Sequence, residues 1–142
     1  MRILLIEDNV GDARLTQEIL RDSKLSNRID IIHNGLEALA FLRREGQYVN
    51  AVQPDLILLD LSLPAREGME VLVEIKADDV LKLIPVIILT SSQGEQDIVR
   101  SYNLHANAYV VKPMNLDEFI AVIKSIEGFW FGVVKLPPSE KE

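Results

Sequence analysis

Acidic, hydroxyl and amine side chains stand at the ends of short apolar runs in this chain. Glu7 and Asp8 follow the first run, Asp60 follows a later one, and Thr90 and Lys112 end the last two. If these runs are strands of one parallel sheet, their carboxyl ends lie along the edge where open α/β sheets bind ligands. We therefore expect three carboxylates, one hydroxyl and one ammonium to form a single site.

The residue types of this site suit the phosphorylation of a carboxylate. Three neighbouring carboxylates repel one another and need a cation, and an all-oxygen site favours a hard ion, Mg²⁺ above all. An aspartate can attack phosphorus to form an aspartyl phosphate. A lysine and a metal ion can stabilise the moving phosphoryl group, and a threonine hydroxyl can donate a hydrogen bond to it.

The elements that must position these side chains alternate along the chain. Runs that are apolar at nearly every position are typical of strands covered on both faces of a parallel sheet, and they span residues 3–6, 29–32, 56–59, 86–89 and 109–111. Segments with helical spacing of apolar residues lie between and after them. Four such segments are marked by Leu15, Ile19 and Leu20; by Leu36, Leu39 and Leu42; by Val71, Leu72 and Ile75; and by Leu116, Phe119, Ile120, Ile123, Ile126 and Trp130.

One further helical segment, residues 95–103, has a weaker pattern. Only three of its residues are suited to burial, Ile98, Val99 and Tyr102. We expect it to be the least firmly held helix, because few buried apolar contacts mean low local stability.

Five strand–helix repeats predict an α/β fold with right-handed crossovers and helices on both faces of a parallel sheet. We expect a three-layer, doubly wound, five-stranded sheet with the flavodoxin-like order 2-1-3-4-5. The domain should span residues 1–131. The tail, residues 132–142, carries two prolines and then charged residues, so its end is expected to be disordered.

The composition excludes several classes of function. A chain of 142 residues suits one domain with its own core. The net charge of −7 argues against a broad basic surface for nucleic acid or anionic lipid. The lack of cysteine excludes thiolate metal sites and cysteine nucleophiles. There is no signal peptide and no apolar run of the roughly 20 residues that span a membrane, so we expect a cytoplasmic protein.

Four motifs, in order, resemble those of the response-regulator receiver family over residues 2–127. Any one of them alone would be a weak signal. They are Ile6-Glu7-Asp8-Asn9; the run from Asp55 to Pro64, with Gly68 after it; Leu89-Thr90-Ser91; and Tyr109-Val110-Val111-Lys112-Pro113.

This resemblance implies a set of metal ligands. Glu7, Asp8 and Asp60 would hold Mg²⁺, with the backbone carbonyl of Ser62 as a further ligand.

The resemblance also implies roles in the reaction and in the switch that follows it. Asp60 would accept the phosphoryl group, and Lys112 and Thr90 would contact its oxygens. Tyr109 would follow Thr90 inward on activation, and the bond between Lys112 and Pro113 would be cis, a minority state of about 5–6% for prolines in folded proteins. The donor would be a sensor histidine kinase. The added charge would shift the face formed by the last two strands and helices.

Some features resemble a narrower group, the stand-alone receivers that partner phytochrome-type sensor kinases. They are Leu104-His105, the long connection over residues 45–54, and the ending from Phe129 to Pro137. His105 stands at a helix end where a left-handed residue, often glycine, is wanted. Such a protein would carry no catalytic effector and would signal through a partner.

Other interpretations of these residues stay open at this point. Glu7 and Asp8 could merely favour a helix dipole, and Tyr109 could be an ordinary strand aromatic. The aromatic cluster 129–131 could complete the packing of the last helix or form the contact of a homodimer, since three adjacent aromatics cannot all point inward. His33 and His105 are better explained as structural or exposed residues than as ligands.

Three alternative functions are disfavoured. A phosphatase with an aspartyl-phosphate intermediate would need a second aspartate two residues after the nucleophile, where Ser62 stands. A nucleotide or flavin module would need a glycine-rich loop after the first strand, where the chain has acids. A pseudo-receiver that only binds partners does not fit, because every residue of the chemistry is present.

Overall fold

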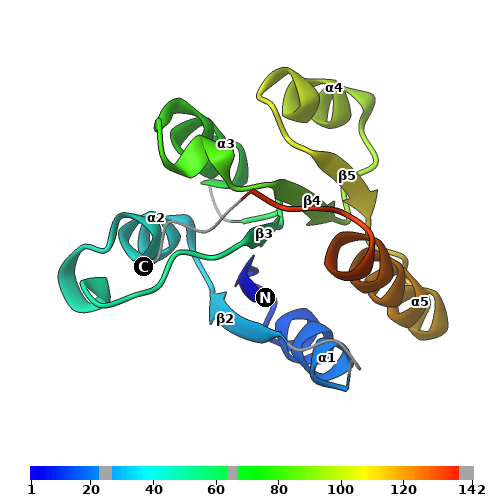
Figure 1. Ribbon diagram of the computed structural model, residues 1–142. Helices are drawn as coiled ribbons and strands as arrows, with labels where there is room; N and C mark the ends of the chain where they lie inside the picture. Colours follow the sequence, from blue (N-terminus) through cyan, green and yellow to red (C-terminus); the bar gives the residue numbers. More distant parts are fainter. Residues whose placement is uncertain (23–26, 64–66, 138–142) are drawn as a thin grey trace.

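The computed structural model describes residues 1–22, 27–63 and 67–137. Its strands form one parallel sheet in the order β2-β1-β3-β4-β5 (Figure 1), as the sequence predicted. The strands are β1 (Arg2–Ile6), β2 (Arg28–Ile32), β3 (Leu56–Leu59), β4 (Val86–Thr90) and β5 (Ala108–Val111). The expected disorder at the end of the tail falls on residues 138–142, which lie outside the described residues.

Helices cover both faces of the sheet. Figure 1 shows α1 and α5 on one face and α2, α3 and α4 on the other, which confirms the three-layer architecture. The helices are α1 (Val10–Arg21), α2 (Gly35–Arg43), α3 (Glu67–Ala77), α4 (Glu95–Asn103) and α5 (Leu116–Ile126). The long connection after α2 contains a short 3₁₀ helix, η1 (Gly46–Tyr48), and the chain continues beyond α5 in a π-helical turn, η4 (Glu127–Phe131).

The core is divided by the sheet into two apolar clusters, because successive strand residues point to opposite faces. Leu4, Ile57 and Leu59 pack with α2 and α3 on one face. Leu5 and Leu58 pack with α1 and α5 on the other. The central strands β1, β3 and β4 are thereby buried on both sides, which explains why their sequences are apolar at nearly every position.

Asparagine side chains begin three of the helices at the edge where the strands end. Asn9, Asn34 and Asn115 each accept a hydrogen bond from the backbone N–H three residues on, at 2.8–3.1 Å. Such caps satisfy helix N–H groups that have no partner within the helix. They hold the turns after β1, β2 and β5 in place.

Some apolar residues that marked the predicted helices are exposed instead of buried. Leu36 and Leu116 lie in the first turns of α2 and α5, with 78% and 58% of their surface accessible. Val99 and Tyr102 on α4 are also about half exposed, at 59% and 50%. Two of the three apolar candidates on α4 thus face solvent, and the expectation that α4 is the least firmly held helix stays a prediction.

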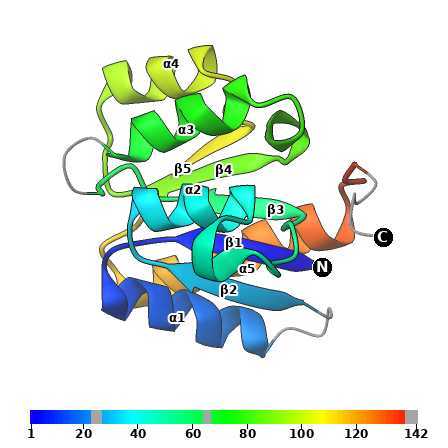
Figure 2. The same ribbon diagram turned by 90° about the vertical axis from the view of Figure 1, so that its left-hand side faces the viewer.

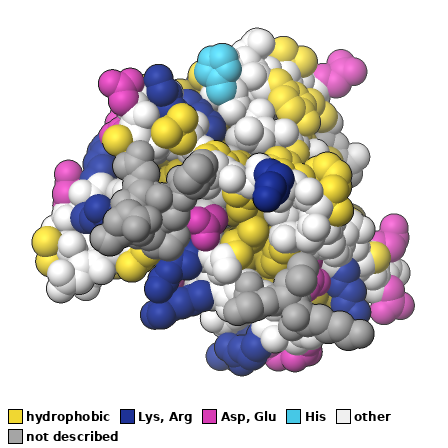
Figure 3. Space-filling model, in the orientation of Figure 1, with side chains coloured by type: hydrophobic (Ala, Val, Ile, Leu, Met, Phe, Trp, Pro, Cys, Tyr) yellow, Lys and Arg dark blue, Asp and Glu magenta, His cyan; other side chains and the backbone are white. Residues whose placement is uncertain are grey.

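Two further expectations concern the surface and the helix end after α4. His105 has a φ of 73°, so a left-handed residue does stand there. Figure 3 shows basic and acidic side chains interspersed on the face where the amino terminus lies, without a broad basic area on that face. Within residues 1–22, 27–63 and 67–137, no helix is both long and apolar enough to cross a bilayer.

Candidate functional site

The parallel register brings the predicted residues together at one edge of the sheet. Ile6 pairs with Leu59, and Leu59 pairs with Ile88, so the residues after β1 and β3 stand next to each other. Figure 2 shows the five strands running in the same direction between the helical layers, so their carboxyl ends share one side of the molecule. The site predicted from the ends of the apolar runs therefore exists as one cluster.

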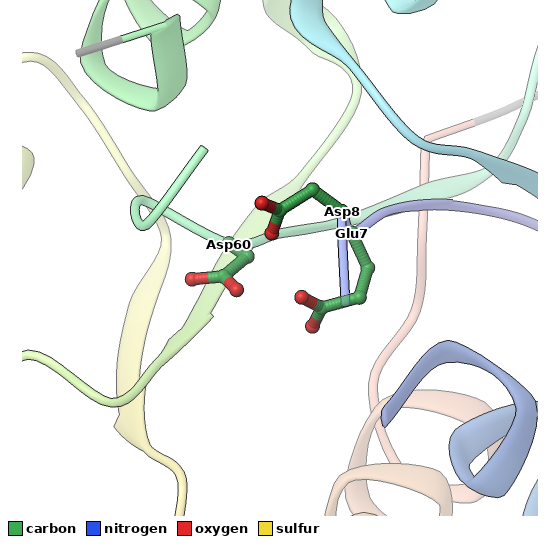
Figure 4. A group of neighbouring side chains, drawn as sticks. All are labelled: Glu7, Asp8 and Asp60. Atoms are coloured by element: carbon green, nitrogen blue, oxygen red, sulfur yellow. The ribbon is translucent and has the colours of Figure 1, made fainter. Parts of the chain in front are cut away.

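Three carboxylates form the centre of this cluster. Each of Glu7, Asp8 and Asp60 offers an oxygen within 4.8 Å of the others, and Figure 4 shows the three groups close together where β1 and β3 end. Glu7 and Asp60 are buried, with 2% and 3% of their surface accessible. Buried carboxylates need a compensating positive charge. An all-oxygen donor set of this kind fits a hard divalent cation such as Mg²⁺.

Lys112 supplies a positive charge to this cluster. Its Nζ lies 2.5 Å from Glu7 Oε1, 2.9 Å from Asp60 Oδ2 and 3.0 Å from Asp12 Oδ2. Only 8% of the side chain is exposed. An ammonium has three N–H donors, so these three carboxylates use all of them.

The electrostatics of the cluster shift the pKa values of Glu7 and Asp60 in opposite directions. Burial, together with a hydrogen bond to Asp60, raises the pKa of Glu7 to about 8. Burial acts in the same direction on Asp60, but hydrogen bonds from Glu7, the Ser62 N–H and Lys112 outweigh it, so the pKa of Asp60 lies below its usual value. For Lys112, burial is outweighed by Glu7 and Asp60, and its pKa is raised. Asp60 is thus ionised and Lys112 charged at neutral pH, whereas Glu7 retains a proton over much of the neutral range.

The loop after β3 and the end of β4 complete the surroundings of Asp60. The backbone N–H of Ser62 donates to Asp60 Oδ1 at 2.9 Å. The hydroxyl groups of Ser62 and Thr90 lie 3.1 Å apart, and Thr90 is fully buried. Thr90 therefore has its hydroxyl beside the loop that carries Asp60, where the sequence predicted it.

Gly68 allows α3 to approach this loop closely. A Cβ atom at Gly68 would lie 2.5 Å from the Cα of Leu61 and 2.9 Å from the carbonyl oxygen of Asp60. No side chain fits at such distances, so the motif position held by Gly68 has a steric explanation.

Two neighbours of the site were not found from the sequence. Asp12 contacts Lys112 from α1, and a ring nitrogen of His33 lies 2.9 Å from the carbonyl oxygen of Glu7. The only sequence signal for Asp12 is its place three residues after the cap Asn9. Acids are common there for the sake of the helix dipole, so that signal does not point to Lys112.

The prediction of a cis bond before Pro113 is wrong for this structure. The described residues contain no cis peptide bond, so Lys112 is followed by a trans proline. Trans is the more stable isomer of such a bond by about 0.5–1 kcal/mol, and the Lys112 side chain reaches its three carboxylates from this backbone.

With this geometry in place, the comparisons with known proteins identify the family. A model of the response regulator receiver domain matches residues 3–124. This chain belongs to the response-regulator receiver family. Receivers are the phosphorylation-controlled domains of two-component signalling, so the function predicted from the sequence is confirmed at this level.

Two similar receivers indicate the narrower group. Response regulator Rcp1 of Synechocystis sp. is 47% identical over 135 residues, which are 95% of this chain and 92% of Rcp1. The structure of the Mn²⁺-bound form of Rcp1 matches with a TM-score of 0.93 over 96% of this chain and 99% of that one, at 47% identity. The phosphorylated cyanobacterial phytochrome response regulator RcpA matches equally well, with a TM-score of 0.93, 49% identity and coverage of 96% and 98%. The predicted resemblance to phytochrome-type receivers agrees with the match to RcpA.

Proposed function

We propose that Asp60 is the phosphoryl acceptor of this receiver, with Mg²⁺ held by Glu7, Asp8, Asp60 and the backbone carbonyl of Ser62. The observation that carries this proposal is the ionised, buried Asp60 carboxylate among two other carboxylates and an ammonium. The bound ion would neutralise the acidic group and stabilise negative charge on the phosphoryl oxygens. The Mn²⁺-bound form of Rcp1 supports a divalent ion in a relative of this kind.

The transfer step follows from these positions. A carboxylate oxygen of Asp60 attacks phosphorus and forms an O–P bond, while the N–P bond to a phosphohistidine breaks. The imidazole nitrogen keeps the electron pair of that bond. Lys112 donates to an oxygen of the transferred group, and Thr90 turns its hydroxyl from Ser62 toward another.

The donor that we propose is a sensor histidine kinase of the phytochrome type, acting in the cytoplasm. RcpA, a phytochrome response regulator with 49% identity, supports this class of partner. The phosphoryl group adds nearly two negative charges at neutral pH. Thr90 and Tyr109 would pass the change to α4, in which only Ser101 is buried, and from there to a downstream protein.

Intact-mass spectrometry after incubation with acetyl phosphate and Mg²⁺ tests the acceptor. We expect a gain of one phosphoryl group by the wild type and none by Asp60→Asn. Asp117→Asn is a matched control, because Asp117 is an exposed acid in the first turn of α5. Labelling that persists in Asp60→Asn would refute the assignment. A wild type that neither gains mass nor binds BeF₃⁻ would be a pseudo-receiver that acts by contact alone.

We further propose that the end of the domain forms the contact of a homodimer. Trp130 and Phe131 pack against the core, but Phe129 is 54% exposed, and Val133 beyond it is 69% exposed. Sedimentation velocity of Phe129→Ser should show a weaker dimer than Val49→Ser, which removes another apolar side chain that is more than half exposed, after η1. Identical sedimentation of both variants and the wild type would place any dimer contact elsewhere.

A further inference from the structure

Asp12 differs from the other two carboxylates that contact Lys112. Glu7 and Asp60 belong to the acidic group that fits a divalent cation, whereas Asp12 lies outside that group. Its Oδ2 is nevertheless 3.0 Å from Lys112 Nζ. Of these three carboxylate partners of Lys112, Asp12 is therefore the one that would not serve as a metal ligand.

The position of Asp12 is set by its backbone. Its N–H donates to Asn9 Oδ1 at 2.9 Å, and its carbonyl oxygen accepts a hydrogen bond from the Thr16 hydroxyl at 2.8 Å. Thr16 is buried at 2% exposure. The first turn of α1 is thus held at both ends, and it directs the Asp12 carboxylate toward Lys112.

Lys112 and a divalent cation would seek the same oxygens. Two of the three N–H donors of Lys112 are satisfied by Glu7 and Asp60. When Glu7 and Asp60 give oxygens to a metal ion, Lys112 must release part of these bonds and is repelled by the ion. The side chain is 92% buried, so a lost hydrogen bond cannot be replaced freely by water.

We propose that Asp12 is a positioning residue, which retains the Lys112 ammonium beside Asp60 when Glu7 and Asp60 turn to the metal. Lys112 would then keep one fixed carboxylate partner and have donors free for a phosphoryl oxygen. This inference rests on the metal site of the proposed function, and it deepens that function by adding a residue from α1. Asp12 would act through Lys112 and would not touch the phosphoryl group.

A double-mutant cycle on Mg²⁺ affinity tests this role without any phosphorylation. Titration calorimetry would compare the wild type, Asp12→Asn, Lys112→Met and the double variant. With Lys112 present, Asp12→Asn should weaken Mg²⁺ binding about fivefold, because a neutral amide holds the Lys112 ammonium less firmly than a carboxylate does. With Lys112→Met, the same change should have less than about a twofold effect, since only the distant charge is lost.

Two matched variants separate position from charge. Asp12→Glu keeps the carboxylate and should bind Mg²⁺ nearly as the wild type does. Glu18→Gln removes an exposed charge from the same helix and should change the affinity less than twofold. Circular dichroism checks that each variant folds, and Lys112→Gln supplies a second background.

The outcomes distinguish this inference from the proposed function. An equal effect of Asp12→Asn with and without Lys112 would overturn the positioning role alone. A wild type that binds no Mg²⁺ would refute both. Failure of Asp60 to accept a phosphoryl group would leave the Mg²⁺ cycle readable and would contradict only the proposed function.

Discussion

The hydroxyl group of Tyr109 donates a hydrogen bond to the backbone carbonyl of Ser92 across 3.0 Å. Ser92 stands between β4 and α4, and its own N–H donates to Thr90 Oγ1 at 3.4 Å. The backbone N–H of Tyr109 also donates to the hydroxyl of Tyr102 on α4, at 3.1 Å. Tyr109 on β5 therefore joins the hydroxyl at the end of β4 to α4, in which Ser101 is the one buried residue.

The first prediction concerns this connection. Tyr109→Phe keeps the ring but loses the bond to Ser92, so the free energy of unfolding should fall by about 1 kcal/mol in urea titrations. Asp60 should still be phosphorylated, but the phosphorylation-dependent NMR shifts of residues 91–94 should shrink. Tyr48→Phe, which loses a hydroxyl bonded to Glu37, should leave those shifts intact. Unchanged shifts in Tyr109→Phe would argue against a switch role.

The second prediction tests the close approach at Gly68. Gly68→Ala places a Cβ against backbone atoms of Asp60 and Leu61, which cannot move aside as a flexible side chain would. We expect a loss of about 1–3 kcal/mol in stability and weaker Mg²⁺ binding, measured by urea unfolding and calorimetry. Gly128→Ala, where no atom lies within 4 Å of the added Cβ, should be neutral or stabilising. Similar results for both would show that α3 can shift.

The third prediction is a dependence of stability on pH. Asp78 Oδ1 accepts hydrogen bonds from the N–H groups of Val80 and Leu81 at 2.8 and 3.0 Å, and these lower its pKa. A carboxylate with a lowered pKa stabilises the fold above its unfolded pKa of about 3.9, and this contribution is lost as the pH falls through the folded pKa. Asp78→Ala should therefore cost about 1 kcal/mol at pH 7.

The pH series itself provides the control. The difference between wild type and Asp78→Ala should shrink as unfolding is measured from pH 7 toward pH 3. Asp78→Asn offers a neutral acceptor, so its difference from Asp78→Ala should not change with pH. A constant gap between the wild type and Asp78→Ala would mean that the charge of Asp78 plays no part.

The fourth prediction concerns the left-handed residue after α4. His105 has a φ of 73° and is exposed. A residue with a Cβ atom costs about 1–2 kcal/mol of steric strain in this conformation. Glycine avoids the strain, but its greater conformational freedom in the unfolded chain offsets part of the gain. His105→Gly should therefore raise the free energy of unfolding by about 0.5–1 kcal/mol. His105→Ala keeps the strain, so a gain of the same size in that variant would point to the imidazole instead.

Much of the fold could be predicted because a strand that is buried on both faces of the sheet has apolar residues at nearly every position. β3 is apolar throughout and buried at every position, so its four residues were recognised as one run. Leu36 was expected to be buried with Leu39 and Leu42, but it is exposed. Helical spacing indicates which residues share a face of a helix. It does not indicate whether other elements cover that face along its whole length. That depends on the packing of α2.

The sequence by itself determined the strands, their order and the chemistry of the site, because an apolar run that ends in a polar residue marks a strand end at the ligand-binding edge. Only the tertiary structure decided which carboxylates share the donors of Lys112. Asp12 and Lys112 are 100 residues apart, and they meet because α1 begins after β1 and Lys112 follows β5 at the same edge of the sheet. No local pattern encodes that contact, since it depends on how distant segments are arranged around one sheet.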